Sequence, residues 1–297
     1  MTTNAQTPQR LLSADLLAGF WSSKVAVIAA FVFVFMVVLA LAAPWISPQD
    51  PYDLSQLNLL DSRLAPFEKG IDGTVYLLGT DQQGRDMFSA ILHGLRISLF
   101  VAVVSSVTAL VIGTSLGILS GMRRGWLDTV LMRIVDVQLS IPAVLVSLVL
   151  LAVLGRGIDK IIFALITVQW VYFARTARAA TLVEMSKDYV EAAQSFGFSR
   201  TRIMFWELLP NVLPPLLVVA MVEFAHAIAL EATLSFLGVG LPITEPSLGL
   251  LISTGFAYLQ NGEYWISLFP GIALLLLVFN LNLVAEWFRE SLDSRRR

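Results

Sequence analysis

The sequence has few charged residues, and long apolar runs take their place. Asp, Glu, Lys and Arg make up 14% of the 297 residues, apolar residues make up 57%, and the mean hydropathy is +0.76. An ordinary soluble domain contains about 25% charged residues. This shortage excludes a soluble globular protein and predicts a membrane protein. The net charge of −2 is uninformative about nucleic acid, because in a membrane protein the placement of charge matters more than its sum.

Cysteine is absent and histidine occurs only twice. Disulfides, thiolate chemistry and cysteine-based metal sites are therefore excluded. The G-x-x-x-x-G-K-[ST] phosphate-binding motif is also missing, so we do not expect this chain to hydrolyse ATP. The apolar runs contain no H-E-x-x-H, nucleophile elbow or paired aspartates, which argues against an intramembrane enzyme and leaves no catalytic residue to predict.

Apolar runs of membrane-spanning length, about 20 residues each, occupy most of the chain. They predict six spans, at 25–46, 95–121, 134–154, 161–180, 211–238 and 265–286. The fourth is the weakest, because Gln169, Arg175 and Arg178 interrupt it. The first is longer than the apolar core of a signal peptide, so we expect an uncleaved anchor, with cleavage after the "ALA" at 40–42 as the alternative.

The distribution of Lys and Arg predicts the orientation, since these residues are retained on the cytoplasmic side of short loops. Six spans place both termini on one side, and that side carries 14 of the 20 Lys and Arg residues. The sequence thus predicts an all-α membrane protein with both termini cytoplasmic. Its expected parts are cytoplasmic tails at 1–24 and 287–297, an external segment at 47–94, and a five-helix core at 95–286 with a cytoplasmic loop at 184–209.

The cytoplasmic loop contains the polar string "YVEAAQSFGFSRTRIMFWELLPN". Asp188 and Glu191 have the spacing of a capping box, which predicts that a short helix begins there. Gly197 is suited to the left-handed conformation that ends a helix. Ser199 can cap a second helix running to Leu209, which we expect Pro210 to end because proline lacks a backbone N–H and disfavours helical angles in the residue before it.

The apolar residues on these two helices are expected to be buried against another surface. Ile203 and Trp206 are expected to share one face, and Phe205 and Leu209 to form a second apolar strip. These strips fit a helix lying among lipid headgroups and equally a helix that inserts into a groove on a cytoplasmic partner. The spacing alone leaves both open.

The same string resembles the cytoplasmic coupling motif of the inner-membrane permeases of ATP-binding-cassette importers. That motif reads E-A-A, three residues, G, then nine residues to I-x-L-P. The matching residues are Glu191, Ala192, Ala193, Gly197, Leu209 and Pro210. Glu207 stands where the motif has isoleucine. The resemblance implies that these six residues couple the chain to an ATPase subunit, because in the family this loop docks into a cleft on that subunit.

Further strings resemble the dipeptide/oligopeptide/nickel branch of these permeases, and specifically the second of its two permease subunits. They occur in order along nearly the whole chain, as "LLGTDQQGRDMFSAILHGLRISL", "LDTVLMRIVDVQLSIPAVL", "ELLPNVLPPLLV", "EATLSFLGVGLPITEPSLGLLI" and "LFPGIALLLLVFNLNLVAEWFRESLD". The resemblance implies a type I importer permease fold in the bacterial inner membrane and transport of peptides or similar small solutes. It also implies a homologous permease, two ATP-binding subunits and an external solute-binding protein as partners. ATP and magnesium would then be bound by the partners, with no cofactor in this chain.

Three ionisable residues within the fifth predicted span are candidates for the translocation path, because such groups are costly inside a membrane. Glu223 and His226 are three residues apart and share a helix face, where they could contact a peptide's amino end or pair with a neighbouring helix. Glu231 falls where the family also has an acidic residue, which favours a structural role. The alternative function is a proton-driven secondary transporter using all three, although no inverted repeat supports it. Two ligands do not make a metal site, so no metal is predicted.

Four other residues carry more modest expectations. His93 is expected on a solvated surface outside the second span, and Asp136 is expected to pair with Arg133 or a helix end. Gly113 and Gly117 have the GxxxG spacing, which predicts a close approach between two helices.

Overall fold

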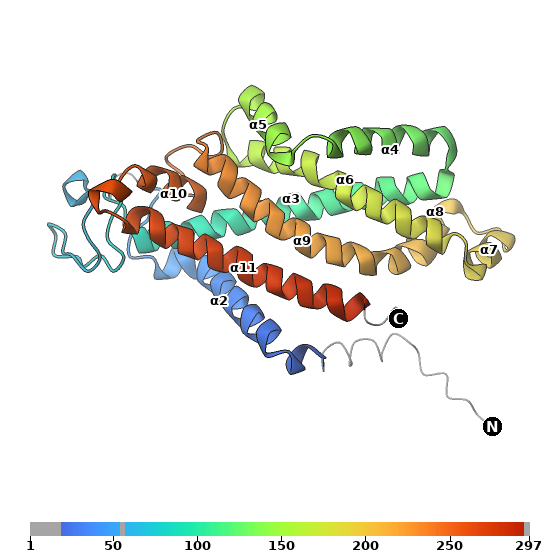
Figure 1. Cartoon of the computed structure of the whole chain (residues 1–297), viewed down its shortest axis with the longest axis horizontal. Coiled ribbons are helices and arrows are strands. Elements are labelled where there is room, and N and C mark those ends of the chain that lie inside the picture. Colours follow the sequence, from blue (N-terminus) through green and yellow to red (C-terminus); the bar gives the residue numbers. More distant parts are fainter. Residues whose placement is uncertain (1–18, 54–56, 294–297) are drawn as a thin grey trace.

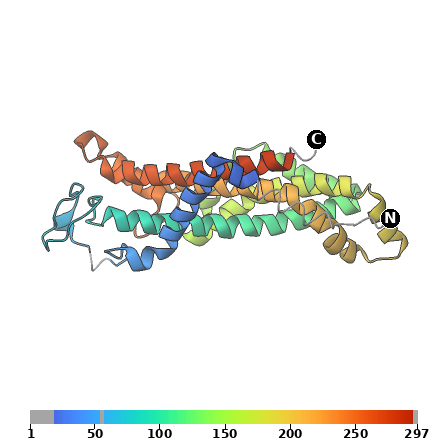
Figure 2. The same cartoon turned by 90° about the horizontal axis from the view of Figure 1, so that it is seen from below.

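The structure is a computed structural model that describes residues 19–53 and 57–293, and in these residues it is almost entirely helical. The long helices lie side by side in an elongated bundle (Figures 1 and 2). The helices are α2 (Lys24–Ile46), α3 (Met87–Arg123), α4 (Gly125–Leu139), α5 (Ala143–Leu154), α6 (Ile158–Glu184), α7 (Asp188–Ser195), α8 (Arg200–Arg202), α9 (Leu209–Phe236), α10 (Leu248–Phe256) and α11 (Trp265–Asp293). No strand forms in the described ranges, which contain two isolated β-bridges.

Within the described residues, four helices are long and apolar enough to cross a membrane. They are α2, α3, the continuous helix Arg200–Phe236 and α11. A fifth candidate is the pair α4 and α5, which is bent by 92°. The sequence predicts one span through this bend, but Pro142 disfavours helical angles at Ile141 and breaks it. The predicted fourth span, α6, is not among the candidates, since its Gln and Arg residues lower its hydropathy.

Helix α3 lies at the centre of the bundle and packs against both α6 and α9. Gly113 and Gly117 face α6, and the predicted close approach is confirmed. A Cβ added at Gly117 would lie 2.4 Å from the carbonyl oxygen of Ala174 and 2.7 Å from Cβ of Ala177. Gly121 continues the contact against Thr181. Small residues thus let the backbones of α3 and α6 approach more closely than other side chains would allow.

Ion pairs join α4 to α6 and account for the charges that interrupt the predicted fourth span. Arg178 donates to both carboxylate oxygens of Asp128, at 2.5 and 2.8 Å. Arg175 pairs with Asp136. The expectation that Asp136 pairs with Arg133 or a helix end is therefore wrong, because α4 packs along α6 and brings Arg175 to the carboxylate.

The two segments that are external in the predicted topology, 47–94 and 239–264, pack on one another at the end of the bundle opposite α7 (Figure 1). The indole N–H of Trp265 donates to the carbonyl of Thr80 at 3.2 Å, and the hydroxyl of Tyr258 donates to Gln82 at 2.9 Å. Arg85 pairs with Asp81 at 3.0 Å, and both side chains are buried. These contacts give the turn-rich segments a defined structure without strands.

Helix α3 begins at Met87, earlier than the predicted span at 95, because Asp86 caps it by accepting from the amide of Ser89 at 2.9 Å. His93 is consequently inside the helix and only 4% exposed, with its ring 5.2 Å from that of Tyr52. The expected solvated surface role for His93 is therefore wrong. Helix α11 similarly continues past 286 to Asp293. Residues 1–18 of the predicted N-terminal tail and 294–297 of the C-terminal tail lie outside the described residues.

Candidate functional site

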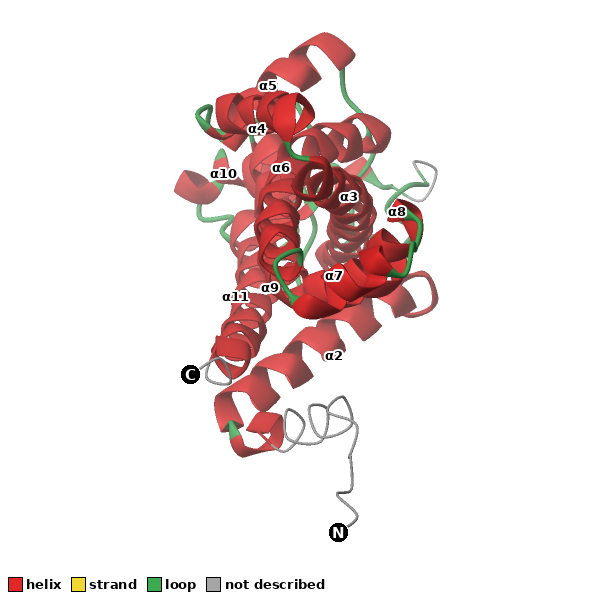
Figure 3. Ribbon diagram, turned by 90° about the vertical axis from the view of Figure 1, so that its right-hand side faces the viewer, coloured by secondary structure: helices red, strands yellow, loops and turns green. Residues whose placement is uncertain are grey.

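The motif residues form a corner at one end of the bundle, where α7 and α8 lie (Figures 1 and 3). Helix α7 begins at Asp188 as predicted, but the capping box does not form. Its N-cap is Lys187, which makes no side-chain cap hydrogen bond within the part of the chain described. Asp188 and Glu191 therefore stabilise the first turn only through the helix dipole, because negative charge is favourable near a helix N-terminus.

Gly197 ends α7 as predicted. Its φ is +74°, and the chain turns through two hydrogen bonds. The amide of Gly197 donates to the carbonyl of Gln194 at 2.9 Å, and the amide of Phe198 donates to that of Ala193 at 3.1 Å. This pair of bonds is the Schellman arrangement, in which glycine takes the left-handed position at least cost.

Ser199 caps the second helix by accepting from the amide of Arg202 at 3.3 Å, as predicted. The expectation that Pro210 ends this helix is wrong. Ile203–Leu208 form π-helical turns, Leu209 has helical angles of −54° and −46°, and the chain continues as α9. Pro210 lies in the first turn of α9, directly after the π-helical turns.

The π turns also change which residues share a face. Ile203 and Leu208 are five residues apart, the spacing of one π turn, and both are buried. Trp206 is 76% exposed, so the expected shared face of Ile203 and Trp206 is wrong. Phe205, at 56% exposure, lies outward, and Leu209 is half-buried. A sequence reading based on α-helical spacing misses this shift.

The inner face of the corner is part of the subunit core. Val190, Ala193, Ile203 and Leu208 pack in one cluster with Ile118 of α3, Phe173 and Ala177 of α6, and Val212 and Leu216 of α9. If α7 were displaced, its buried side chains would therefore press on side chains of all three long helices, α3, α6 and α9.

The outer face is exposed and partly aromatic. Glu191, Ala192, Gly197 and Pro210 are exposed, whereas Ala193 is buried. Phe196 is 79% exposed. A surface hollow of about 540 Å³ is lined by Ser199, Thr201, Arg202, Phe205 and Trp206. Exposed aromatic rings beside arginines are typical of surfaces that bind another protein.

A hydrogen-bonded chain, absent from the sequence predictions, lies behind the corner. Tyr189 donates to Glu184, the last residue of α6, at 2.7 Å, and Asn211 of α9 donates to the hydroxyl of Tyr189 at 3.3 Å. Burial and the neighbouring Glu184 raise the pKa of Tyr189 above its ordinary value. Tyr189 and Asn211 are 22 residues apart, so no local spacing pattern could have paired them.

The candidate path residues separate into two environments. Glu223 is 4% exposed, and its Oε1 lies 3.6 Å from Nδ1 of His226, whose side chain is 65% exposed. Gln169 of α6 donates to the backbone carbonyl of Glu223 at 2.7 Å, and its own Oε1 is buried without a partner among the described residues. The structure thus brings Glu223 and His226 together, beside a second polar side chain.

Glu231 lies apart from this pair and is fully buried. Its carboxylate accepts from Ser98 of α3 at 2.7 Å and from Ser235 at 2.8 Å. The Ser98 bond joins α3 to α9, whereas the Ser235 bond lies within α9. In this conformation Glu231 does not reach the surface of the subunit.

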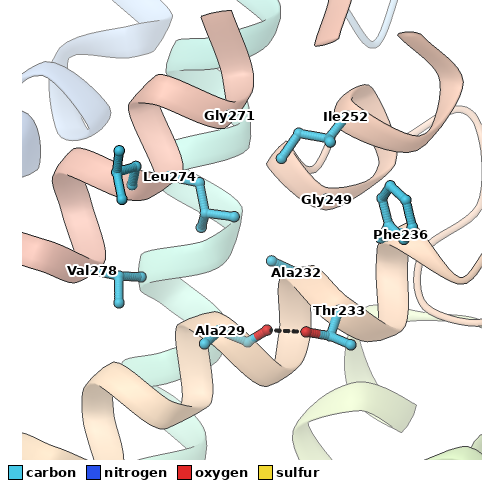
Figure 4. Close-up of a pocket in the computed structure, with 10 residues that line it drawn as sticks. Ala229, Ala232, Thr233, Phe236, Gly249, Ile252, Gly271, Leu274 and Val278 are labelled. Atoms are coloured by element: carbon cyan, nitrogen blue, oxygen red, sulfur yellow. Dashed lines mark hydrogen bonds between the residues drawn. The ribbon is translucent and has the colours of Figure 1, made fainter. Parts of the chain in front are cut away.

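A recess of about 430 Å³ opens further along α9, between α9, α10 and α11 (Figure 4). The recess forms where four lining residues have only a methyl side chain or none: Ala229, Ala232, Gly249 and Gly271. The larger lining residues are mostly aliphatic. The hydroxyl of Thr233 donates to the carbonyl of Ala229 at 2.7 Å. The recess therefore offers apolar surface and little hydrogen-bonding capacity.

The sequence matches two families. Residues 113–297 match the binding-protein-dependent transport system inner membrane component, and residues 12–66 match the N-terminal TM domain of oligopeptide transport permease C. The first match contains α6, the α7–α8 corner, α9 and α11.

Curated relatives match over nearly their whole length. The di/tripeptide transport system permease protein DppC of Pseudomonas aeruginosa is 34% identical, covering 94% of this chain and 92% of its own. The dipeptide transport system permease protein DppC of Escherichia coli is 36% identical, covering 97% and 98%. The oligopeptide transport system permease protein OppC of Bacillus subtilis is 33% identical, covering 95% and 90%.

The fold resembles a chain of the MetNI methionine ABC transporter, solved in inward-facing conformations. The TM-score is 0.55 at 22% identity, and the match covers 68% of this chain and 96% of that one. The chain described here therefore belongs to the family of binding-protein-dependent transport system inner membrane components and is a multi-pass protein of the inner membrane.

Proposed function

We propose that this chain is a permease subunit of an ATP-driven importer that carries peptides or similar small solutes from an external binding protein into the cytoplasm. The observation that carries the proposal is the α7–α8 corner. Four of its six motif residues, Glu191, Ala192, Gly197 and Pro210, are exposed on its outer face. Its inner face is anchored in the core of the subunit by Val190, Ala193, Ile203 and Leu208. The dipeptide and oligopeptide names of the relatives support the solute class.

The corner is proposed to receive the motion of the ATPase subunits. Glu191, Ala192 and Ala193 lie in α7, Gly197 forms the turn that follows it, and Leu209 and Pro210 begin α9. When two ATPases close around ATP, they would pull the outer face of α7 sideways. The buried inner face would pass this displacement to α3, α6 and α9, and the pathway would open toward the binding protein.

We further propose six spans with both termini cytoplasmic. The corner and the external segments lie at opposite ends of the bundle, which supports opposite sides of the membrane (Figure 1). Helix α6 would be the fourth span despite its charges, because Asp128 and Asp136 pair with Arg178 and Arg175. Pairing lowers the cost of ionised groups within a membrane.

The proposed assembly contains a homologous permease, two ATP-binding subunits and the solute-binding protein. ATP and magnesium would be held by the ATP-binding subunits, and this chain would supply neither a catalytic residue nor a cofactor. The absence of a phosphate-binding motif and the family's dependence on a binding protein support this division of roles.

Glu223 and His226 are our candidates for the translocation path, because their paired side chains combine a buried carboxylate with an exposed imidazole. Glu231 is proposed instead to hold α3 against α9 through its bond with Ser98, while Ser235 of α9 fixes the orientation of the carboxylate. The family match favours this account over a proton-driven transporter using all three groups.

Reconstitution tests the proposal. The complete complex in liposomes, with its binding protein, should import a radiolabelled dipeptide only when ATP is present inside, and a protonophore should not affect the rate. If this chain alone took up the dipeptide, independently of ATP, and the protonophore abolished that uptake, the result would support the secondary transporter instead.

A further inference from the structure

The hydrogen-bonded chain behind α7 connects three helices through one hydroxyl group. Tyr189 donates to Oε2 of Glu184 at 2.7 Å and accepts from Asn211 at 3.3 Å. Glu184 ends α6, Tyr189 lies in the first turn of α7, and Asn211 lies in the first turn of α9. The Tyr189 hydroxyl therefore links the exposed short helix to two of the long ones.

Each partner of Tyr189 is held in place by another bond. The second oxygen of Glu184 accepts from the ammonium group of Lys187 at 2.7 Å, and the Glu184 side chain is 12% exposed. Asn211 also donates to the carbonyl of Glu207 at 2.7 Å. The hydroxyl of Tyr189 is protonated at physiological pH and can therefore donate, and burial beside Glu184 raises its pKa further above the ordinary value.

Hydrogen bonds and apolar contacts constrain motion differently. Val190 and Ala193 bury apolar surface, and this attraction has no preferred direction, so it resists separation of α7 more than sliding. Hydrogen bonds weaken steeply when their angle changes, so they resist sliding. The bonds of Tyr189 supply the directional part of the attachment.

We propose that Tyr189 is a positioning residue whose hydroxyl makes α6 and α9 move together when α7 is displaced. This coupling keeps the number of ATP molecules hydrolysed per solute transported low. This inference rests on the proposed function, because it assigns one residue's part within the coupling of ATPase to permease. Tyr189 itself lies behind the motif residues, bonded to Glu184 and Asn211 rather than exposed with them.

The test is Tyr189→Phe in the complete complex in liposomes, with a radiolabelled dipeptide as probe. The variant retains the ring and removes only the hydroxyl. We expect normal assembly with the ATPases and normal ATP turnover, with the ATP hydrolysed per dipeptide imported rising about tenfold, the scale set by hydrogen bonds to a charged group. Asn211→Ala should raise the same ratio, and the double variant should rise no further than Tyr189→Phe alone.

A matched control is Tyr264→Phe at the other end of the bundle. The Tyr264 ring is 51% exposed and packs on Trp265, and the described residues offer its hydroxyl no hydrogen bond. We expect an unchanged ratio. An unchanged ratio in Tyr189→Phe, or loss of ATPase assembly there, would overturn the positioning role. Absence of ATP-driven uptake in the unsubstituted complex would instead overturn the proposed function.

Discussion

The amide of Phe198 donates to the carbonyl of Ala193 at 3.1 Å, across a Gly197 whose φ is +74°. This bond turns the chain from α7 toward α8 and so presents the outer face of the corner. The shape of the proposed ATPase contact thus depends on one left-handed residue.

Gly197→Leu should abolish uptake while the subunit still inserts. No described atom lies within 4 Å of an added Cβ, so the substitution causes backbone strain rather than a clash. That strain is about 1–2 kcal/mol, enough to shift the corner. Gly262→Leu is the control, since Gly262 has a φ of +86° and equally little around an added Cβ, at the opposite end of the bundle. If both variants lost uptake equally, then transport would be no more sensitive to the shape of the corner than to a turn elsewhere in the subunit.

Glu191→Lys should also abolish uptake and weaken association with the ATPase subunits, measured by copurification. Glu191 is exposed in the first turn of α7, so the substitution reverses charge on the outer face with little change in packing. The helix dipole accounts for only about 0.3–1 kcal/mol of α7 stability. Glu290→Lys, at an exposed position of α11, should retain both properties. Normal transport by Glu191→Lys would contradict the coupling assignment.

Gly117→Val should destabilise the subunit itself. The added side chain would meet the Ala174 carbonyl and force α3 from α6, and overpacking of this kind costs about 1–3 kcal/mol. The midpoint of thermal unfolding in detergent should fall. Gly271→Val, where an added Cβ meets no described atom within 4 Å, should leave it nearly unchanged.

Arg178→Gln should destabilise the packing of α4 on α6 by about 1–3 kcal/mol, because it leaves the carboxylate of Asp128 without its bidentate partner. Asp128→Asn added to Arg178→Gln should recover part of the loss. If the double variant loses more free energy of unfolding than the two single variants lose together, then Arg178 and Asp128 do not interact favourably.

Glu223→Gln should reduce dipeptide uptake at least about tenfold without preventing assembly, since it removes the charge while retaining the size of a side chain beside His226. The control is Glu286→Gln, an exposed position on α11. Normal uptake by Glu223→Gln would remove Glu223 from the translocation path.

Local patterns predicted the turns of the corner well. Gly197 and Ser199 take the expected positions because helix ends depend on residues within one turn of each other. The prediction that the second helix ends before Pro210 is wrong, because the π-helical turns at Ile203–Leu208 continue directly into α9. A sequence periodicity of 3.6 cannot anticipate that change of register.

Contacts between distant segments could not be predicted in the same way. Asp136 pairs with Arg175, 39 residues away, rather than with the nearby Arg133, because the packing of α4 on α6 decides the partner. The ring of the buried His93 packs against Tyr52, which lies in the segment before α3. The bond between Tyr189 and Asn211 likewise depends on how α7 folds back against α9.

In the proposed complex, the outer face of α7 contacts an ATPase subunit. Because the chain has no cysteine, single cysteines can be introduced at Ala192 and Phe196, both exposed, and labelled with a photoactivatable thiol reagent. We predict crosslinks to the ATPase subunit at both positions, with yields that change when ATP is added, and none from Leu275→Cys, an exposed position on α11. Crosslinking of Ala192→Cys and Phe196→Cys to lipid alone, in a complex that transports normally, would contradict the account.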